Sequence, residues 1–238
     1  MERQMKRKCY SEFIGTFILV FVGTGAVVMN DVSGGAITHV GIAICFGLVV
    51  MAMIHTLGEI SGAHINPAVT VAFWLANRFE GREVLPYVAS QIAGGLAAST
   101  VLLLMFPEHL TLGATLPAGT DLQSFVLEII LTFILMFVII TVSVGSKEQG
   151  LLAGITIGAV VGFEAMFAGP ISGASMNPAR SIGPALMSGQ LQSLWLYVVA
   201  PMLGAALAIT TCRLIQWPGC CADDNPIKEK CSKEESDR

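Results

Sequence analysis

Two tripeptides of the same sequence stand far apart in the chain, Asn66-Pro67-Ala68 and Asn177-Pro178-Ala179. Each opens a short apolar stretch, and its proline suits the first position of a helix, where the missing N–H costs nothing. The asparagine before it can cap the helix with its oxygen and donate its amide N–H elsewhere. Two such donors beside helix N-termini, which carry partial positive charge, favour hydrogen bonds to uncharged polar molecules and oppose cations.

The elements that must position these tripeptides are long apolar segments. Of the 238 residues, 54% are hydrophobic and 13% are charged, a balance rare in soluble globules. Six segments approach the roughly 20 residues that cross a hydrocarbon core. They cover residues 10–29, 40–57, 86–106, 125–144, 150–167 and 194–215. Two stretches that begin with the prolines, 67–75 and 178–187, are too short to span and are predicted to be half-helices.

These segments predict an all-α membrane protein with six transmembrane helices plus two re-entrant half-helices. We expect one channel domain at residues 10–215, with repeat halves at about 10–106 and 125–215 and a break in the loop at 107–123. A cytoplasmic N-terminus at 1–9 and a cytoplasmic tail at 216–238 complete the expected organisation.

The two halves of the chain repeat each other. Glu12–Leu19 matches Glu128–Leu135, and Ile60–Ala68 matches Ile171–Ala179. Each half carries three spans, an odd number, so the second half is expected upside down relative to the first, with one half-helix entering from each face of the membrane. Irregular backbone at membrane depth must line a cavity or be buried. We therefore expect pore-lining carbonyls in both loops, at Gly62, Ala63, His64, Ile65, Gly173, Ser175 and Met176.

The basic residues indicate the orientation. Every Lys and Arg except Arg180 falls on the side of the two termini, which predicts a multi-pass protein of the cell (plasma) membrane with both termini cytoplasmic. Arg180 directly follows the second tripeptide, where a topology bias would not put it. A functional role for this side chain is therefore favoured over a surface position.

From residue 10 to residue 215 the chain resembles the major intrinsic protein, or aquaporin, family. The resemblance is carried by the paired tripeptides, by the Glu-x-x-x-Thr-Phe start of each half at Glu12 and Glu128, and by Asn-Pro-Ala-Arg in the second copy. It implies a right-handed helical bundle assembled as a homotetramer, with one pore for water and small neutral solutes in each subunit. It also implies an outer constriction formed by Phe46, Ala165, Ala174 and Arg180.

The constriction residues bear on the solute. Water-selective members of the family typically place a histidine where Ala165 stands, so the opening is expected to be wider and less polar. The sequence from Gly169 to Ser181 is similar to the nodulin-26-like branch, whose members often pass glycerol, urea or neutral metalloid acids. Phe46 departs from the tryptophan or alanine common in that branch, and Ser181 departs from the aspartate of dedicated glycerol channels.

Four further ionisable residues have two interpretations each. For Glu12 and Glu128, a functional carboxylate inside a span competes with a structural one that accepts hydrogen bonds from the loops, and the resemblance favours the structural role. Glu164, beside Ala165, is expected either at a helix or subunit contact or tuning the pore. His64 is expected to line the pore with its carbonyl, with a pH-sensing ring as the alternative.

Three other function classes are less well supported. A secondary transporter also uses inverted repeats and broken helices, with Glu12 and Glu128 as the symmetric candidates for ion coupling. A cation channel conflicts with Arg180 and with two converging helix N-termini. No metal cluster, nucleophile–base pair or phosphate loop indicates an enzyme, so we expect no catalytic residues, cofactor, metal or nucleic-acid partner. The expected partners are the lipid bilayer, further copies of the chain, water and small neutral solutes.

Overall fold

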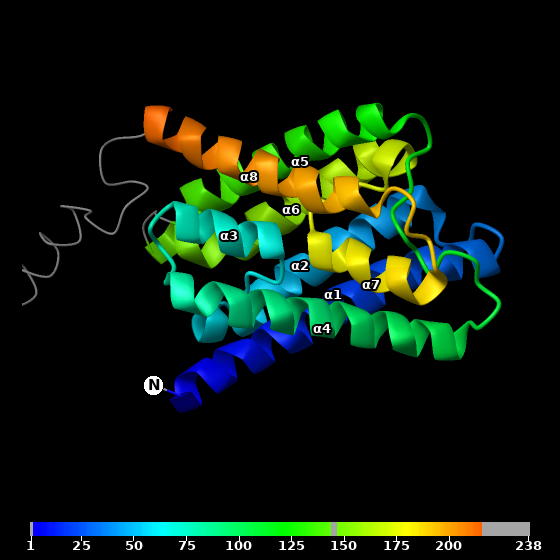
Figure 1. Cartoon of the computed structure of the whole chain (residues 1–238), viewed down its shortest axis with the longest axis horizontal. Coiled ribbons are helices and arrows are strands. Elements are labelled where there is room, and N and C mark those ends of the chain that lie inside the picture. The colour runs from blue at the N-terminus through cyan, green and yellow to red at the C-terminus, as the bar shows by residue number, and fades with distance from the viewer. Residues whose placement is uncertain (1, 144–146, 216–238) are drawn as a thin grey trace, which may run out of the picture.

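The computed structural model describes residues 2–143 and 147–215, which form eight α-helices joined by loops (Figure 1). The helices are α1 (Glu2–Val32), α2 (Thr38–Ser61), α3 (Pro67–Leu75), α4 (Gly81–Met105), α5 (Asp121–Val142), α6 (Lys147–Ser172), α7 (Pro178–Ser188) and α8 (Leu194–Ile215). The tail predicted at 216–238 lies outside the described residues.

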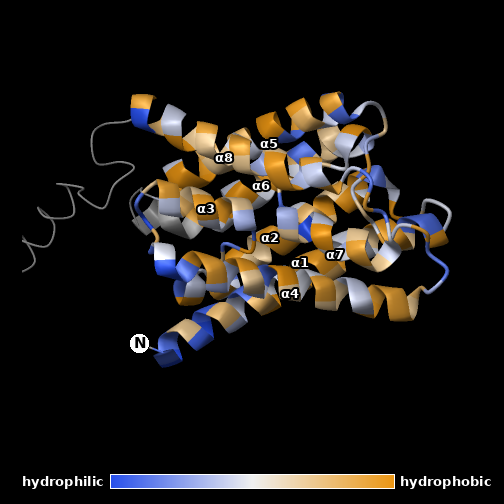
Figure 2. Cartoon of the chain, in the orientation of Figure 1, coloured by the Kyte–Doolittle hydropathy of each residue, from blue (hydrophilic) through white to orange (hydrophobic). Residues whose placement is uncertain are grey.

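Six helices of the described chain are long and apolar enough to cross a membrane, and they coincide with the six predicted spans. Figure 2 shows that hydrophobic residues dominate these helices, whereas hydrophilic residues gather at their ends and in the loops. The remaining two helices, α3 and α7, begin at Pro67 and Pro178 and have only 9 and 11 residues. The predicted all-α membrane fold is confirmed.

Most of the helices extend beyond their predicted bounds, and α1 and α6 are the clearest cases. Helix α1 begins at Glu2 because its charged first residues, although too polar for a membrane core, are good helix formers and include an ion pair between Lys6 Nζ and Glu2 Oε1 (2.6 Å). Helix α6 continues past Pro170 to Ser172. Hydropathy locates the membrane-crossing part of a helix, whereas the backbone hydrogen bonds decide where it ends.

Repeat-related helices pack in the same way. Helix α1 lies on α4 and α5 lies on α8, and a glycine lies at each contact. A Cβ added to Gly94 would lie 2.3 Å from Phe13 O, and one added to Gly204 would lie 2.3 Å from Ile129 O. Helix α2 also packs on α6 at glycines, since a Cβ added to Gly47 would lie 2.7 Å from Gly158 O. Small residues thus bring the backbones together where the bilayer offers no hydrophobic driving force for helix association.

We expect Gly94→Ala to destabilise the protein by about 1–3 kcal/mol, because the methyl group would force the α1 and α4 backbones apart. Thermal unfolding of the detergent-solubilised protein measures the change. Gly58→Ala is the matched control, since a Cβ at this helical position meets nothing within 4 Å. Equal melting temperatures for the two variants would contradict the importance of this contact.

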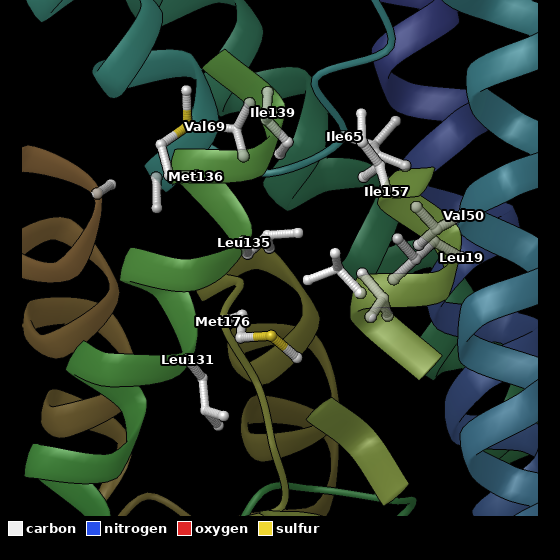
Figure 3. Packing of buried hydrophobic residues seen from close by; sticks show 14 of the residues in the cluster. Leu19, Val50, Ile65, Val69, Leu131, Leu135, Met136, Ile139, Ile157 and Met176 are labelled. Atoms are coloured by element: carbon white, nitrogen blue, oxygen red, sulfur yellow. The ribbon is translucent and has the colours of Figure 1, made fainter. Parts of the chain in front are cut away.

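The half-helices lie end to end between α4 and α8, with their N-termini meeting near the centre of the bundle (Figure 1). Apolar side chains surround this junction. Figure 3 shows Leu135 of α5 and Ile157 of α6 in the same cluster as Ile65 and Met176, which belong to the two loops that precede the half-helices. The bundle therefore holds both irregular loops inside its apolar core.

Candidate functional site

Helices α3 and α7 begin with the same cap. Asn66 Oδ1 accepts a hydrogen bond from Ala68 N (2.9 Å), and Asn177 Oδ1 accepts hydrogen bonds from Ala179 N (3.0 Å) and Arg180 N (3.4 Å). Both asparagines have extended backbones, and a proline follows each at the first helical position. The asparagine oxygens are thus committed to their own helices.

The two asparagine amides also join the loops to each other. Asn66 Nδ2 donates to Met176 O (2.8 Å), and Asn177 Nδ2 donates to Ile65 O (2.8 Å). This exchange cannot be seen in the sequence, because only the fold brings the two loops together. Each amide nitrogen carries a second N–H, and both asparagines line the same cavity. One donor per asparagine is therefore available to a molecule in that cavity.

Glu12 organises the first loop from inside α1. Its Oε1 accepts from Ser61 Oγ (2.7 Å) and His64 N (3.0 Å), and its Oε2 accepts from Ile65 N (2.6 Å). Gln91 of α4 adds a fourth hydrogen bond, from Nε2 to Oε2 (2.7 Å). The carboxylate is fully buried and saturated by donors. A single side chain thus fixes the loop that leads to α3.

Glu128 does the same for the second loop. Its Oε1 accepts from Ser172 Oγ (2.7 Å) and Ser175 N (2.9 Å), and its Oε2 accepts from Met176 N (2.8 Å). Each of these three hydrogen bonds has a counterpart at Glu12. Among the described residues, Glu128 has no counterpart to the bond from Gln91. Both carboxylates are occupied by loop donors, as the structural interpretation requires.

The loop backbones are strained in the same places. Ala63 and Ile65 have φ of 47° and 44°, and their counterparts Ala174 and Met176 have φ of 43° and 53°. Residues other than glycine seldom adopt this left-handed region, which costs on the order of 1–3 kcal/mol per residue. The strain persists because the carboxylates hold adjacent N–H groups.

Two tyrosines that sequence analysis did not single out hold the ends of the loops. Tyr87 Oη donates to Ser61 O (2.8 Å), and Tyr197 Oη donates to Ser172 O (2.6 Å). Both tyrosines are completely buried. They are as far apart in sequence as Gly94 and Gly204, which do align in the repeat. Extending the repeat to α4 and α8 would have found them.

A cavity of about 160 Å³ follows the two loops and is walled by α1, α2, α5 and α6. Since a water molecule occupies about 30 Å³ of the liquid, this space suits a short file of waters. It is lined by most residues predicted for the pore, namely Phe46, Gly62, Ala63, His64, Ile65, Asn66, Ala165, Ala174, Ser175, Met176, Asn177 and Arg180. Gly173 is not among the lining residues; its Cα faces Thr115, whose Cγ2 would lie 3.0 Å from an added Cβ.

The structure brings the four predicted constriction residues to this one cavity. Phe46 comes from α2, Ala165 from α6, Ala174 from the second loop and Arg180 from α7. The Arg180 guanidinium carbon lies 5.1 Å from the centroid of the Phe46 ring. Two of the four walls are thus methyl groups, and the other two are an aromatic ring and a cation in contact with each other.

Arg180 is held by the loop between α4 and α5. Its Nη1 donates to Gly113 O (2.8 Å), and its Nε has no hydrogen-bond partner among the described residues. The side chain is 4% exposed. A buried guanidinium with free donors is a strong site for a polar solute. Like Tyr87 and Tyr197, Gly113 was not selected from the sequence.

His64 lines the cavity, but its ring is also tightly packed. It lies between Phe73 and Phe79, with ring centroids 4.8 and 4.9 Å away, and next to Tyr87. Its Nδ1 lies 3.1 Å from Thr70 Oγ1. The ring therefore packs the junction between the first loop and α3, in addition to any role of its carbonyl.

Glu164 stands apart from this site. It is 1% exposed, it is not among the cavity-lining residues, and neither carboxylate oxygen has a hydrogen-bond partner in the described part of the chain. Glu164 was expected either at a helix or subunit contact or tuning the pore. Its geometry is that of a residue packed between helices. Its lack of partners contrasts with Glu12 and Glu128.

Comparison with known proteins identifies the family. The family model described as "Major intrinsic protein" matches residues 1–211. The chain is 46% identical over 229 residues to "Aquaporin NIP1-3" of Oryza sativa subsp. japonica, covering 95% of this chain and 78% of that protein. It is 45% identical over 228 residues to "Putative aquaporin NIP4-1" of Arabidopsis thaliana, covering 94% of this chain and 78% of that protein.

A solved structure has the same fold. The aquaglyceroporin from Plasmodium falciparum superposes with a TM-score of 0.81 at 23% sequence identity, covering 89% of this chain and 96% of that one. Because the family consists of channels, the predictions of a non-enzymatic protein and of a passive channel rather than a secondary transporter are confirmed. The chain belongs to the major intrinsic protein family, in its nodulin-26-like branch, and it is a multi-pass membrane channel for water and small neutral solutes.

Proposed function

We propose that solutes pass through the cavity between the two loops, in contact with Asn66 and Asn177 at its centre. The observation that carries this proposal is the meeting of the two half-helix N-termini at one cavity, where each asparagine has one amide N–H left to donate. A molecule that enters the cavity loses hydrogen bonds to water but accepts hydrogen bonds from the two asparagines. The free-energy cost of entry is therefore low.

The same arrangement excludes protons and ions. Two helix N-termini and the guanidinium of Arg180 place positive potential along the path, which opposes hydronium and other cations. A water molecule whose oxygen accepts from both asparagines cannot also accept a proton from its neighbour in the file. The apolar walls provide too few ligands to replace the hydration shell of an ion.

The alanine walls favour solutes larger than water. Ala165 and Ala174 each place only a methyl group beside the cavity, opposite Phe46 and Arg180. Such an opening accommodates an apolar carbon face against the methyl groups while hydroxyl groups accept from the guanidinium. Facilitation of glycerol or of a neutral metalloid acid such as arsenous or boric acid is therefore the second candidate for the main physiological role.

Osmotic assays on proteoliposomes test both levels of the proposal. Vesicles that contain the protein should shrink faster than empty vesicles under an impermeant osmotic step, with a low activation energy and no proton leak. Stopped-flow comparison of water, glycerol, urea, arsenous acid and boric acid then ranks the solutes. Flux that saturates and collapses with a proton or sodium gradient would contradict passive permeation.

Ala165→His is expected to lower glycerol flux by about tenfold while changing water flux much less, because the imidazole narrows the opening and adds a polar group. Glycerol and water permeabilities of the same proteoliposomes give the ratio. Ala168→Ser, at a buried position on α6 outside the cavity lining, is the control for changes to this helix. An unchanged ratio in the histidine variant would refute the placement of the constriction.

We further propose a plasma-membrane location with both termini cytoplasmic, a homotetrameric assembly, and a channel domain at 10–215. The distribution of Lys and Arg supports the orientation. Large apolar side chains on the outer surface, among them Ile44, Leu104 and Ile130, suit contact with lipid or with neighbouring subunits. Protease accessibility of the termini in sealed vesicles and the mass of the solubilised assembly test these points.

A further inference from the structure

The loop between α4 and α5 is organised around His109, at the end of the bundle opposite the N-terminus (Figure 1). His109 Nδ1 accepts hydrogen bonds from Leu112 N (3.0 Å) and, more weakly, from Thr111 N (3.4 Å). An imidazole nitrogen that accepts from backbone N–H groups carries a lone pair. The proton of the neutral ring is therefore on Nε2, which lies 3.3 Å from Asp31 Oδ2 at the end of α1.

The bonds to His109 fix an unusual backbone. Leu112 is completely buried with φ of 50°, and Gly113 follows with φ of 73°. Gly113 also lies against α1, because a Cβ there would be 2.8 Å from Thr24 Cβ. A left-handed leucine is costly and needs outside support. The hydrogen bond from its own N–H to the imidazole supplies that support.

This backbone carries the carbonyl that holds the constriction arginine. Gly113 O accepts from Arg180 Nη1 at 2.8 Å, and among the described residues this is the hydrogen bond that anchors the guanidinium. The ring of Phe46 contacts the guanidinium but does not fix its direction. The orientation of Arg180 thus depends on a turn whose shape depends on one lone pair of His109.

We propose that His109 is a positioning residue for Arg180, and that a proton on its Nδ1 releases the turn and closes the channel. The doubly protonated ring still donates to Asp31 from Nε2, but its Nδ1–H opposes the N–H groups of Thr111 and Leu112. Gly113 O then leaves Arg180 Nη1, and the guanidinium turns into the lumen, where water offers acceptors. This regulation rests on the proposed permeation path.

Three charged groups of the described chain lie around His109. Asp31 of α1 faces Nε2, and Glu108 lies beside His109 in the same loop, at a hollow lined by both acidic residues. Arg180 is bonded to the same loop at Gly113 O. His109 Nδ1 faces two backbone N–H groups, so a proton on this nitrogen would have no acceptor in the present turn.

Two substitutions distinguish the hydrogen-bond acceptor that His109 provides from its ability to take up a proton. In His109→Asn the side-chain oxygen can accept from the same backbone N–H groups, as in an Asx turn, without titrating. His109→Ala removes the acceptor altogether. His39→Asn is the control for other histidines, since the ring of His39 bonds Met166 O on α6 and not the α4–α5 loop.

The experiment measures water and glycerol flux in proteoliposomes, with inner and outer buffers both at about pH 7.5 or both at about pH 5, the range over which histidine changes charge. Wild type and His39→Asn should lose roughly fivefold in flux at the lower pH. His109→Asn should keep the high flux at both pH values, and His109→Ala should show the low flux at both.

The outcomes are distinct. Flat wild-type flux across the two pH values, or the same drop in His109→Asn as in wild type, would overturn the role of His109 and leave the proposed function standing. If His109→Ala does not fold, the comparison of wild type with His109→Asn decides alone. Wild-type vesicles that shrink no faster than empty ones at about pH 7.5 would overturn the proposed path and this inference with it.

Discussion

Glu128→Gln is expected to abolish most of the water flux and to lower the stability of the protein by on the order of 3 kcal/mol. The carboxylate accepts from Ser172 Oγ, Ser175 N and Met176 N, all within 2.9 Å. An amide can replace one of the two oxygens, but its NH₂ group would oppose a donor at the other. The strained backbone at Met176 then loses the contact that holds it.

Glu164→Gln is the matched control for this change. Glu164 is a buried glutamate on a neighbouring helix, like Glu128, but its oxygens have no hydrogen-bond partners among the described residues. A neutral amide costs less to bury than an unpaired carboxylate. We therefore expect this variant to be as stable as the wild type or more stable, with unchanged water flux.

Thermal unfolding in detergent and osmotic shrinkage of proteoliposomes measure both variants side by side. The prediction is a difference between the two variants in stability and in water flux. If α5 and α6 simply tolerated no substitution, both variants would lose stability and this difference would not appear. Equal losses in the two variants would show that burial of the carboxylate, and not its bonds to the loop, determines stability.

Arg180→Val should weaken the exclusion of charged species while leaving water flux intact or higher. The substitution removes the guanidinium that contacts Phe46 and bonds Gly113 O, and it leaves a shorter, apolar side chain. Loss of about 1.4 kcal/mol of electrostatic barrier raises a crossing rate tenfold, so we expect the cation leak to rise by about tenfold or more.

Decay of an imposed proton gradient, followed with a dye inside the vesicles, measures the leak. Arg213→Val is the control, because Arg213 is an exposed arginine that bonds Leu75 O outside the cavity lining. A leak equal in both variants would mean that the half-helix N-termini alone provide the barrier, and that Arg180 serves solute binding only.

Much of the architecture could be predicted from the sequence, because the bilayer imposes simple rules. A span must be apolar over a fixed length, so the six membrane-crossing segments were predictable, although helices such as α1 extend well beyond them. The starts of α3 and α7 were predictable to the residue, since asparagine before proline is a cap followed by a first helical position. The inverted arrangement followed from an odd number of spans in each repeat.

The roles of Glu12 and Glu128 could be assigned only from the sequence and the structure together. The repeat showed that the two glutamates are equivalent, but hydropathy alone could not distinguish a coupling site from a structural one. The bonds to the loops provide the distinction, since every donor that reaches these carboxylates within the described residues comes from a loop, from the serine that ends the preceding helix, or from Gln91. Neither carboxylate lines the cavity.

The sequence by itself determined the helices, their caps, the repeat and the residue types around the pore, because these depend on local preference and on burial in lipid. Only the tertiary structure decided that Asn66 bonds Met176 O and Asn177 bonds Ile65 O, that Tyr87 and Tyr197 anchor the loops, and that Gly113 holds Arg180. These bonds join backbone carbonyls, which every residue type possesses. The sequence therefore cannot indicate which carbonyl will accept a hydrogen bond, because that depends on which donor the fold brings next to it.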